Sequence, residues 1–161
     1  MDLKRYSGNI NKIQKIFLYG FRKYTNNSGV KRIFCKMLML PFKFFYCIEI
    51  AAGTSIGGGL YIGHPYGITI NPNAVIGNNC NIHKGVTIGQ ENRGKRKGTP
   101  TIGNCVWIGV NATIVGNIRI GDDVLIAPNS YINKDVPSHS VVFGNPCIIK
   151  RVDFATDGYI N

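Results

Sequence analysis

The amino-acid sequence predicts an all-β fold, a parallel β-helix of about five turns, from the spacing of its isoleucines. They return at every sixth position in three runs: Ile50, Ile56, Ile62, Ile68; Ile70, Ile76, Ile82, Ile88; and Ile102, Ile108, Ile114, Ile120, Ile126, Ile132. A slip of two residues separates the first two runs, and a polar break separates the last two. A period of six fits neither an α-helix nor simple strand alternation. It fits a triangular coil in which each of three short strands points one aliphatic side chain inward and small residues form the corners.

The composition divides the chain into three segments. Residues 1–48 carry ten Lys or Arg and one acid, so most of the net charge of +11 belongs to this N-terminal segment. Residues 49–137 form the predicted β-helix, from which the polar, Gly-rich and basic stretch 90–100 is expected to loop out. Residues 138–161 are expected to close the C-terminal end, with the last ten residues frayed. With 161 residues, the chain is long enough for one domain with its own core.

Two helices are predicted in the N-terminal segment. Residues 9–24 place apolar side chains on one stripe and Lys and Arg off it. A second apolar and basic helix is expected from Val30 to Leu40, ended by Pro41. Two roles stay open: a cap over the open end of the β-helix, or a cap that also attaches to a membrane surface through basic and aromatic side chains. The segment is too interrupted by charge to span a bilayer, and no nucleic-acid-binding motif accompanies it.

Cysteine usage bears on the compartment. The five cysteines are scattered and form no CxxC pair: Cys35, Cys47, Cys80, Cys105 and Cys147. This argues against a disulfide framework or a zinc site and favours a reducing compartment. We expect no signal peptide, because no uninterrupted apolar run follows Asp2, Lys4 and Arg5. We therefore expect a cytoplasmic protein, held at the inner face of the membrane if the N-terminal segment binds lipid.

The three histidines limit the catalytic options. His64 follows an inward isoleucine by two residues, at a corner between Gly63 and Pro65, so its side chain is expected to face outward. An exposed imidazole is a natural general base for a hydroxyl at neutral pH, and it needs a partner that fixes its tautomer. Glu49, fifteen residues earlier and a little under one turn away, is the nearest carboxylate. His83 is expected on the same surface one turn on, and His139 is expected to be structural.

With these residues identified, the chain resembles the hexapeptide-repeat acyltransferases, and among them most closely the serine O-acetyltransferase group. The resemblance covers Glu49 to Arg151 and includes the loop after Ile88, the stretch from Trp107 to Ile118 and the closing Gly144-Asn145-Pro146. It implies a left-handed coil, a hand that the period alone does not define. It also implies direct attack of a hydroxyl on acetyl-CoA with no metal, and a homotrimer with active sites between subunits.

The resemblance also assigns roles to single residues. His64 would deprotonate the acceptor hydroxyl, and Glu49 would orient His64. The pantetheine arm of coenzyme A would run along Gly109, Val110, Ala127 and Pro128, with Lys150 and Arg151 near its phosphates. The residues themselves, apart from the resemblance, suggest where the acceptor binds. It is expected near Tyr66, which would stack on a sugar ring, and near His83. Arg93 and Thr99 of the extruded loop are also expected to contact it, although a solvated loop without a role stays an alternative.

The chain departs from the serine enzymes where they bind the amino acid. They carry Asp-His where this chain has Gly63-His64, Arg-His-Pro where it has Gly98-Thr99-Pro100, and Asp where it has Glu49. Because the amino-acid clamp is missing, we expect a sugar acceptor, as in surface-polysaccharide biosynthesis. The alternatives are a serine O-acetyltransferase of cysteine biosynthesis and a non-catalytic β-helix that serves as a scaffold. Metal-dependent hydrolysis, as in carbonic anhydrases of this fold, is disfavoured because the histidine spacing does not match.

Overall fold

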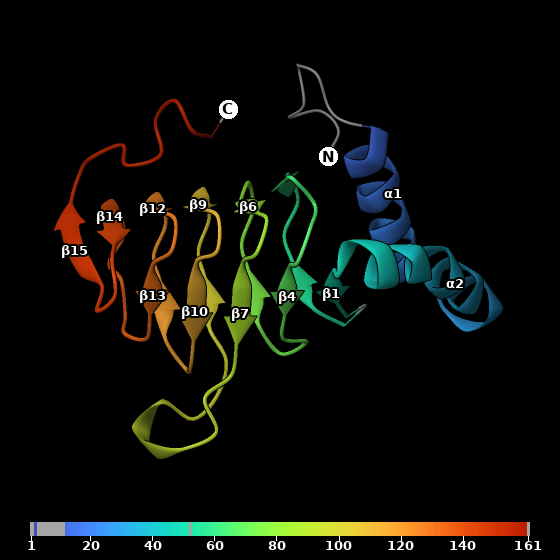
Figure 1. Cartoon of the computed structure of the whole chain (residues 1–161), viewed down its shortest axis with the longest axis horizontal. Coiled ribbons are helices and arrows are strands. Elements are labelled where there is room, and N and C mark those ends of the chain that lie inside the picture. Colours follow the sequence, from blue (N-terminus) through green and yellow to red (C-terminus); the bar gives the residue numbers. More distant parts are fainter. Residues whose placement is uncertain (1, 3–11, 52, 161) are drawn as a thin grey trace.

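The computed structural model describes residue 2, residues 12–51 and residues 53–160. The chain forms a parallel β-helix with two α-helices at its N-terminal end (Figure 1). The helices are α1 (Lys12–Asn26) and α2 (Gly29–Tyr46). Residues 9–11 of the first predicted helix lie outside the described residues.

The strands stack into three flat faces. The first face contains β1 (Glu49–Ile50), β4 (Thr69–Ile70), β7 (Thr87–Gly89), β10 (Thr113–Val115) and β13 (Tyr131–Ile132). The second contains β2 (Ser55–Ile56), β5 (Val75–Ile76), β8 (Thr101–Ile102) and β11 (Arg119–Ile120). The third contains β3 (Tyr61–Gly63), β6 (Asn81–His83), β9 (Val106–Ile108), β12 (Val124–Ile126), β14 (Ser140–Phe143) and β15 (Ile148–Arg151).

The register explains the six-residue period. Each strand pairs in parallel with its counterpart in the next turn, except that β15 returns antiparallel to β14. Ile82 lies between Ile62 and Ile108 in neighbouring turns, and all three are fully buried. Ile68 and Ile70 are both buried, so the two-residue slip places two isoleucines in the core at one corner. The prediction of an all-β parallel β-helix with a short helical N-terminal segment is confirmed.

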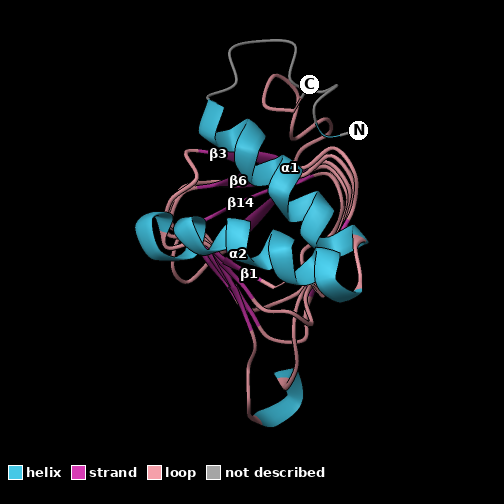
Figure 2. Cartoon of the chain, turned by 90° about the vertical axis from the view of Figure 1, so that its right-hand side faces the viewer, coloured by secondary structure: helices cyan, strands magenta, loops and turns pink. Residues whose placement is uncertain are grey.

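The two helices cover the open end of the first turn (Figure 2). Phe17, Leu18 and Phe21 of α1 are buried in the same core as the isoleucines. Three carbonyl groups of the first turn accept from side chains of α1, and in the described part of the chain no strand precedes this turn to bind them. Gln14 Nε2 donates to Ile62 O at 2.6 Å, and Arg22 donates to two further carbonyls of the first turn. The predicted cap over the β-helix is therefore confirmed.

The prediction that Pro41 ends the second helix is wrong. The helix α2 continues through Pro41 to Tyr46. Burial of Phe42 and its edge-on contact with Phe17, at a centroid distance of 5.2 Å, stabilise the last turn and offset the hydrogen bond that proline cannot make. The end comes at Cys47, which adopts the left-handed conformation (φ 51°), while Ile48 N–H donates to Phe42 O at 3.1 Å.

The stretch 90–100 extends away from the coil, as the sequence predicted, and appears at the bottom of Figure 1. It contains a short 3₁₀ turn, η2 (Gly94–Arg96), and its two ends are joined by reciprocal hydrogen bonds between Glu91 and Gly98, both 2.9 Å.

The expectation of a frayed C-terminus is wrong for the described part of residues 152–160. The Asp123 carboxylate accepts from Ala155 N (3.0 Å), from Thr156 N (2.9 Å) and from Thr156 Oγ1 (2.7 Å). His139 Nδ1 lies 2.8 Å from the same carboxylate. These contacts hold the tail, in which Ala155 and Thr156 are buried, and they give His139 the structural role expected for it.

Candidate active site

His64 lies at the corner between the third and first faces, directly after β3. Its backbone is left-handed (φ 54°) and its side chain is exposed, as the sequence predicted. The last residue of α2 holds this corner in place, because Gly67 N–H donates to Tyr46 O at 2.8 Å. The hydrogen bond fixes the backbone of this corner, and the corner presents the His64 imidazole to solvent. A positioned, exposed imidazole suits a general base.

His83 lies beside this corner, on the outer side of the third face. Its ring contacts Trp107 (centroids 4.6 Å apart) and Tyr61 (6.1 Å). Nδ1 is 2.9 Å from the carbonyl oxygen of Ile108, which can only accept, so Nδ1 carries a proton. Burial lowers the pKa of His83, and the neighbouring His64 lowers it further, while the Ile108 carbonyl acts in the opposite direction. The neutral ring therefore offers the lone pair of Nε2.

The ring of His83 also explains why residue 63 is glycine. A Cβ atom on Gly63 would lie 2.5 Å from His83 Cδ2 and 2.7 Å from its Nε2, well inside van der Waals contact. The ring therefore occupies the space that a side chain at this position would need.

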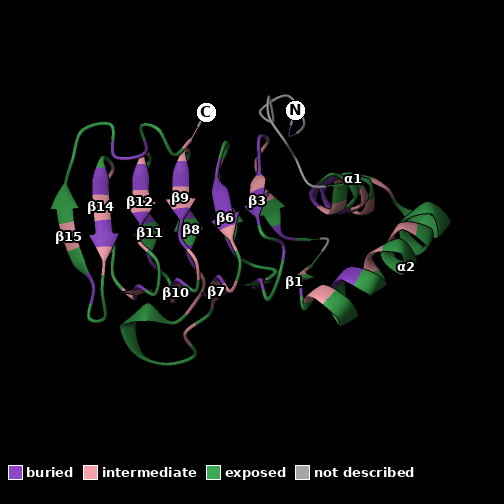
Figure 3. Cartoon of the chain, turned by 45° about the horizontal axis from the view of Figure 1, so that its top comes forward, coloured by how far each residue is buried: buried purple, intermediate pink, exposed green. Residues whose placement is uncertain are grey.

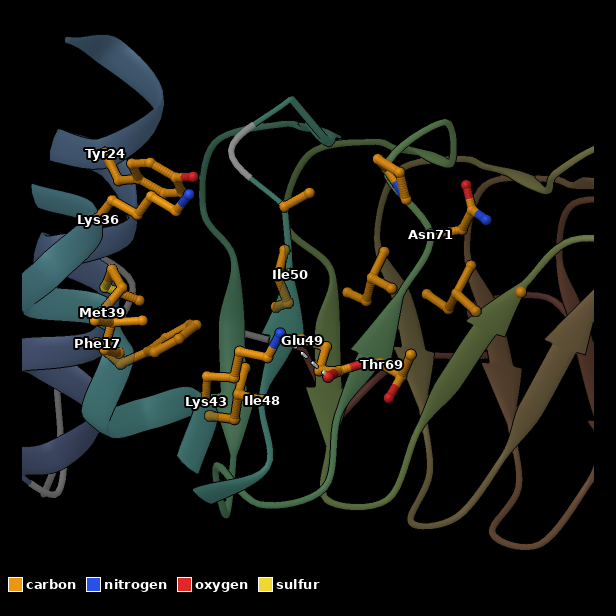
Figure 4. A pocket seen from close by; sticks show the side chains of 16 residues that line it. Phe17, Tyr24, Lys36, Met39, Lys43, Ile48, Glu49, Ile50, Thr69 and Asn71 are labelled. Carbon is orange, nitrogen blue, oxygen red and sulfur yellow. Dashed lines mark ion pairs between the residues drawn. The ribbon is translucent and has the colours of Figure 1, made fainter. Parts of the chain in front are cut away.

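Glu49 lies in β1, at the edge of a groove between the helices and the first face (Figure 4). The groove has a volume of about 460 Å³, and Phe17, Met39, Ile48 and Thr69 also line it. The carboxylate forms an exposed ion pair with Lys43 Nζ at 3.7 Å, drawn as a dashed line in Figure 4.

Glu49 and His64 both lie near β4, Glu49 in the strand that pairs with it and His64 in the corner that precedes it. Glu49 pairs with Thr69 of β4, and the corner of His64 leads into the same strand. Among the described contacts, no hydrogen bond or ion pair joins the two side chains. Their pairing as a catalytic dyad stays a prediction, and it requires Glu49 to turn from Lys43 toward the corner.

The corner of His64 is repeated along the β-helix and forms one continuous edge. Gly85 N–H donates to Tyr66 O (2.9 Å), Asn111 N–H to Lys84 O (3.0 Å), and Asn129 N–H to Val110 O (2.9 Å). We call this column of corners the catalytic edge. It consists of residues 64–67, 84–85, 109–111 and 127–129, which come directly after β3, β6, β9 and β12 of the third face.

Four of the residues expected to contact coenzyme A lie on the catalytic edge: Gly109, Val110, Ala127 and Pro128. Gly109 is buried against the next turn, where a Cβ atom would meet Pro128 N at 2.6 Å. Lys150 Nζ lies 5.6 Å from the centre of the Phe143 ring, at the C-terminal end of this edge. Arg151 is placed elsewhere, because it pairs with Ser140 at the start of β14 and donates to Ser138 O at 2.8 Å.

The residues expected near the acceptor divide into two groups. Tyr66 and His83 lie at the catalytic edge, and one side of the Tyr66 ring contacts Tyr46 of α2 at a centroid distance of 4.9 Å. Arg93 and Thr99 belong to the loop that follows β7, at the opposite end of the first-face strands from His64. Thr99 Oγ1 donates to Asn73 O at 3.0 Å. A single chain therefore does not bring Arg93 and Thr99 to His64.

Sequence reasoning missed Lys84, an exposed cation on the catalytic edge between the corners of His64 and Val110. The signal was present, because Lys84 follows Ile82 by two residues as His64 follows Ile62. In the described part of the chain, no cluster of three His, Cys, Asp or Glu side chains offers a metal site.

Residues 99–134 match the family model described as bacterial transferase hexapeptide (six repeats). Residues 99–134 therefore carry a hexapeptide repeat. A serine acetyltransferase of Staphylococcus aureus is 37% identical over 136 residues, which are 84% of this chain and 60% of the relative. Serine acetyltransferase 2 of Arabidopsis thaliana is 43% identical over 105 residues, 65% of this chain and 32% of the relative.

The solved structures that this chain resembles are also serine acetyltransferases. Serine acetyltransferase from Brucella abortus in complex with coenzyme A matches with a TM-score of 0.71 and 27% identity, covering 86% of this chain and 54% of that one. Soybean serine acetyltransferase in complex with serine matches with a TM-score of 0.65 and 32% identity, covering 75% of this chain and 50% of that one. The resemblance to hexapeptide-repeat acyltransferases close to the serine O-acetyltransferases is confirmed. This chain spans 60% or less of the length of each of these relatives.

Proposed function

We propose that this protein is an acetyl-CoA-dependent O-acetyltransferase in which His64 is the general base. The observation that carries the proposal is the catalytic edge, which holds His64 in one line with Val110 and Pro128, where coenzyme A is expected. His64 takes the proton of an acceptor hydroxyl, and the oxygen attacks the thioester carbon of acetyl-CoA. The C–S bond breaks, and the leaving thiolate of coenzyme A takes the proton from the imidazolium. Lys84 and Lys150 supply positive charge for the phosphates along this edge.

Serine is the acceptor that the relatives support, because each one named above is a serine acetyltransferase. This favours the alternative considered from the sequence over the sugar preferred there. One observation of this structure favours the sugar as the second candidate. Where the serine enzymes are expected to place a carboxylate, Gly63 has no side chain, and the ring of His83 fills the space with a neutral hydrogen-bond acceptor.

We also propose that the chain works as a homotrimer. Because Arg93 and Thr99 lie at the far end of the first face from His64, a neighbouring subunit is needed to bring a loop to the catalytic edge. The five cysteines, all free, fit a reducing cytoplasm. Light scattering of the purified chain gives the mass of the assembly.

The test measures coenzyme A release from acetyl-CoA with L-serine and with a panel of sugars. We expect His64→Ala to lower kcat/KM about a hundredfold or more, because a positioned general base contributes on this scale. His139→Ala is the matched control, since His139 lies at the opposite end of the third-face strands and is expected to leave kcat unchanged. Turnover with serine supports the first acceptor, and turnover with a sugar alone supports the second. Equal turnover by His64→Ala and the unmodified protein would refute the assignment of His64, and acetyl-CoA binding without turnover on any hydroxyl would support the scaffold alternative.

A further inference from the structure

The helix α2 is apolar on two sides, and the β-helix covers only one of them. On the inner side, Phe42 is buried and Met39 and Tyr46 pack against the core. The outer side carries large apolar side chains that remain exposed: Val30, Ile33, Phe34, Met37, Leu38, Phe44 and Phe45. Figure 3 shows most of α2 as exposed, in contrast to the coil beside it.

The exposed side chains form one continuous stripe. Their spacings of three, four and seven residues place them on one side of an α-helix, and we call them the outer stripe. Exposure is high along its whole length, with Val30 at 82%, Phe34 at 63% and Phe45 at 80%. Soluble monomers rarely leave an apolar surface of this extent uncovered, so the outer stripe indicates a contact with something outside this chain.

The charge of α2 indicates what that contact is. The helix carries four cations, Lys31, Arg32, Lys36 and Lys43, and no acidic residue. Among the described residues, the one ion pair made by these cations is that of Lys43 with Glu49. A second copy of α2 would bring eight cations together, and of these only the two copies of Lys43 have an acidic partner, Glu49, which disfavours self-association through this helix. An anionic lipid surface complements both properties, because it offers phosphate groups to the cations and acyl chains to the stripe.

We propose that the outer stripe of α2 docks on an anionic membrane surface, with the helix lying in the plane of the interface. The helices of the described chain are not long and apolar enough to cross a membrane. The β-helix extends away from α2, so its later turns, which carry Val110 and Pro128, lie far from the docked helix (Figure 1). This inference is independent of the proposed acetyl transfer, because it concerns only the surface of α2.

The experiment is co-sedimentation of the full chain with vesicles of phosphatidylcholine alone or of phosphatidylcholine mixed with phosphatidylglycerol. We expect binding to the anionic vesicles, weakened by salt, and little binding to the neutral ones. The double variant Phe34→Ser and Phe44→Ser removes two side chains from the outer stripe and should weaken binding about a hundredfold or more. The variant Lys31→Gln should weaken it roughly fivefold. All three substituted positions are exposed, so the thermal unfolding midpoint of both variants should stay unchanged.

Phe154→Ser is the matched control, because Phe154 is 79% exposed but lies in the tail after β15, at the other end of the β-helix. It should bind the anionic vesicles as the unmodified chain does. Failure of the folded chain to bind anionic vesicles would overturn the proposal. So would equal binding by the Phe34/Phe44 variant, or a fall in assembly mass of that variant without vesicles, which would identify a second copy as the occupant. None of these readouts measures acetyl transfer, so the two proposals fail separately.

Discussion

Substituting Gly63 by alanine tests the packing beside the candidate general base. The added Cβ atom would lie 2.5 Å from Cδ2 and 2.7 Å from Nε2 of His83, and 3.1 Å from Tyr61 Cε1. Carbon atoms in contact are normally about 3.5–4 Å apart, so the His83 ring has to move by about 1 Å. The ring is not free to move, because Trp107 packs against it and Nδ1 donates to Ile108 O.

The cost follows from these contacts. Overpacking in a fixed environment costs about 1–3 kcal/mol, and losing the hydrogen bond to Ile108 costs about 1 kcal/mol more. We therefore expect Gly63→Ala to lower the free energy of unfolding by about 2–4 kcal/mol. Urea unfolding followed by circular dichroism measures this change.

A double-mutant cycle isolates the cause. His83→Ala removes the ring, so adding Gly63→Ala to it should cost little, and the coupling energy should be about 2 kcal/mol. Gly89→Ala is the control, because its Cβ atom would meet Val115 Cγ1 at 3.4 Å and Thr87 Cγ2 at 4.0 Å, both ordinary contact distances. The reasoning is refuted if Gly63→Ala is as stable as Gly89→Ala, or if the two changes at residues 63 and 83 are simply additive.

Two further predictions concern charged groups that hold the ends of the β-helix. Replacing Arg22 by methionine should lower the free energy of unfolding by about 3–5 kcal/mol, because Arg22 pairs with the buried Asp2 carboxylate at 2.6 Å and donates to two backbone carbonyls. Lys23→Met, with no such contacts to the coil, is the control, and an equal loss in both variants would contradict the role of Arg22 as part of the cap. Burial alone would raise the pKa of Asp123, but hydrogen bonds from Thr156, His139 and Ala155 N–H hold that pKa below its usual value. The stabilisation is complete above the unfolded pKa of about 4 and is lost as the pH falls through the lower folded-state pKa. Asp123→Asn should therefore make the free energy of unfolding, measured with urea, fall less steeply at acidic pH. The same acid dependence in the variant and the unmodified protein would refute the assignment.

The sequence alone determined the architecture, because the six-residue period leaves few ways to bury its isoleucines. Each inward isoleucine stacks on one from the next turn, and the same constraint predicts that the polar stretch 90–100 leaves the coil. The outward position of His64 followed from the same count, since a residue two places after an inward isoleucine lies at a corner. The division of the chain at residues 48 and 137 stays a prediction, as does the pairing of His64 with Glu49.

Tertiary structure decided the features that depend on contacts between distant residues. Local propensity predicts that Pro41 stops a helix, but the contact of Phe42 with Phe17 extends it. Local polarity predicts a frayed tail, but the Asp123 carboxylate, more than thirty residues away along the chain, binds it.

The same holds for the candidate site. The period places His83 on an outer surface, but only packing between Tyr61 and Trp107 and the bond to Ile108 O orient its ring over Gly63. Short-range patterns determine which way a side chain points, whereas its partners come from whichever turns, helices and tails the folded chain brings beside it.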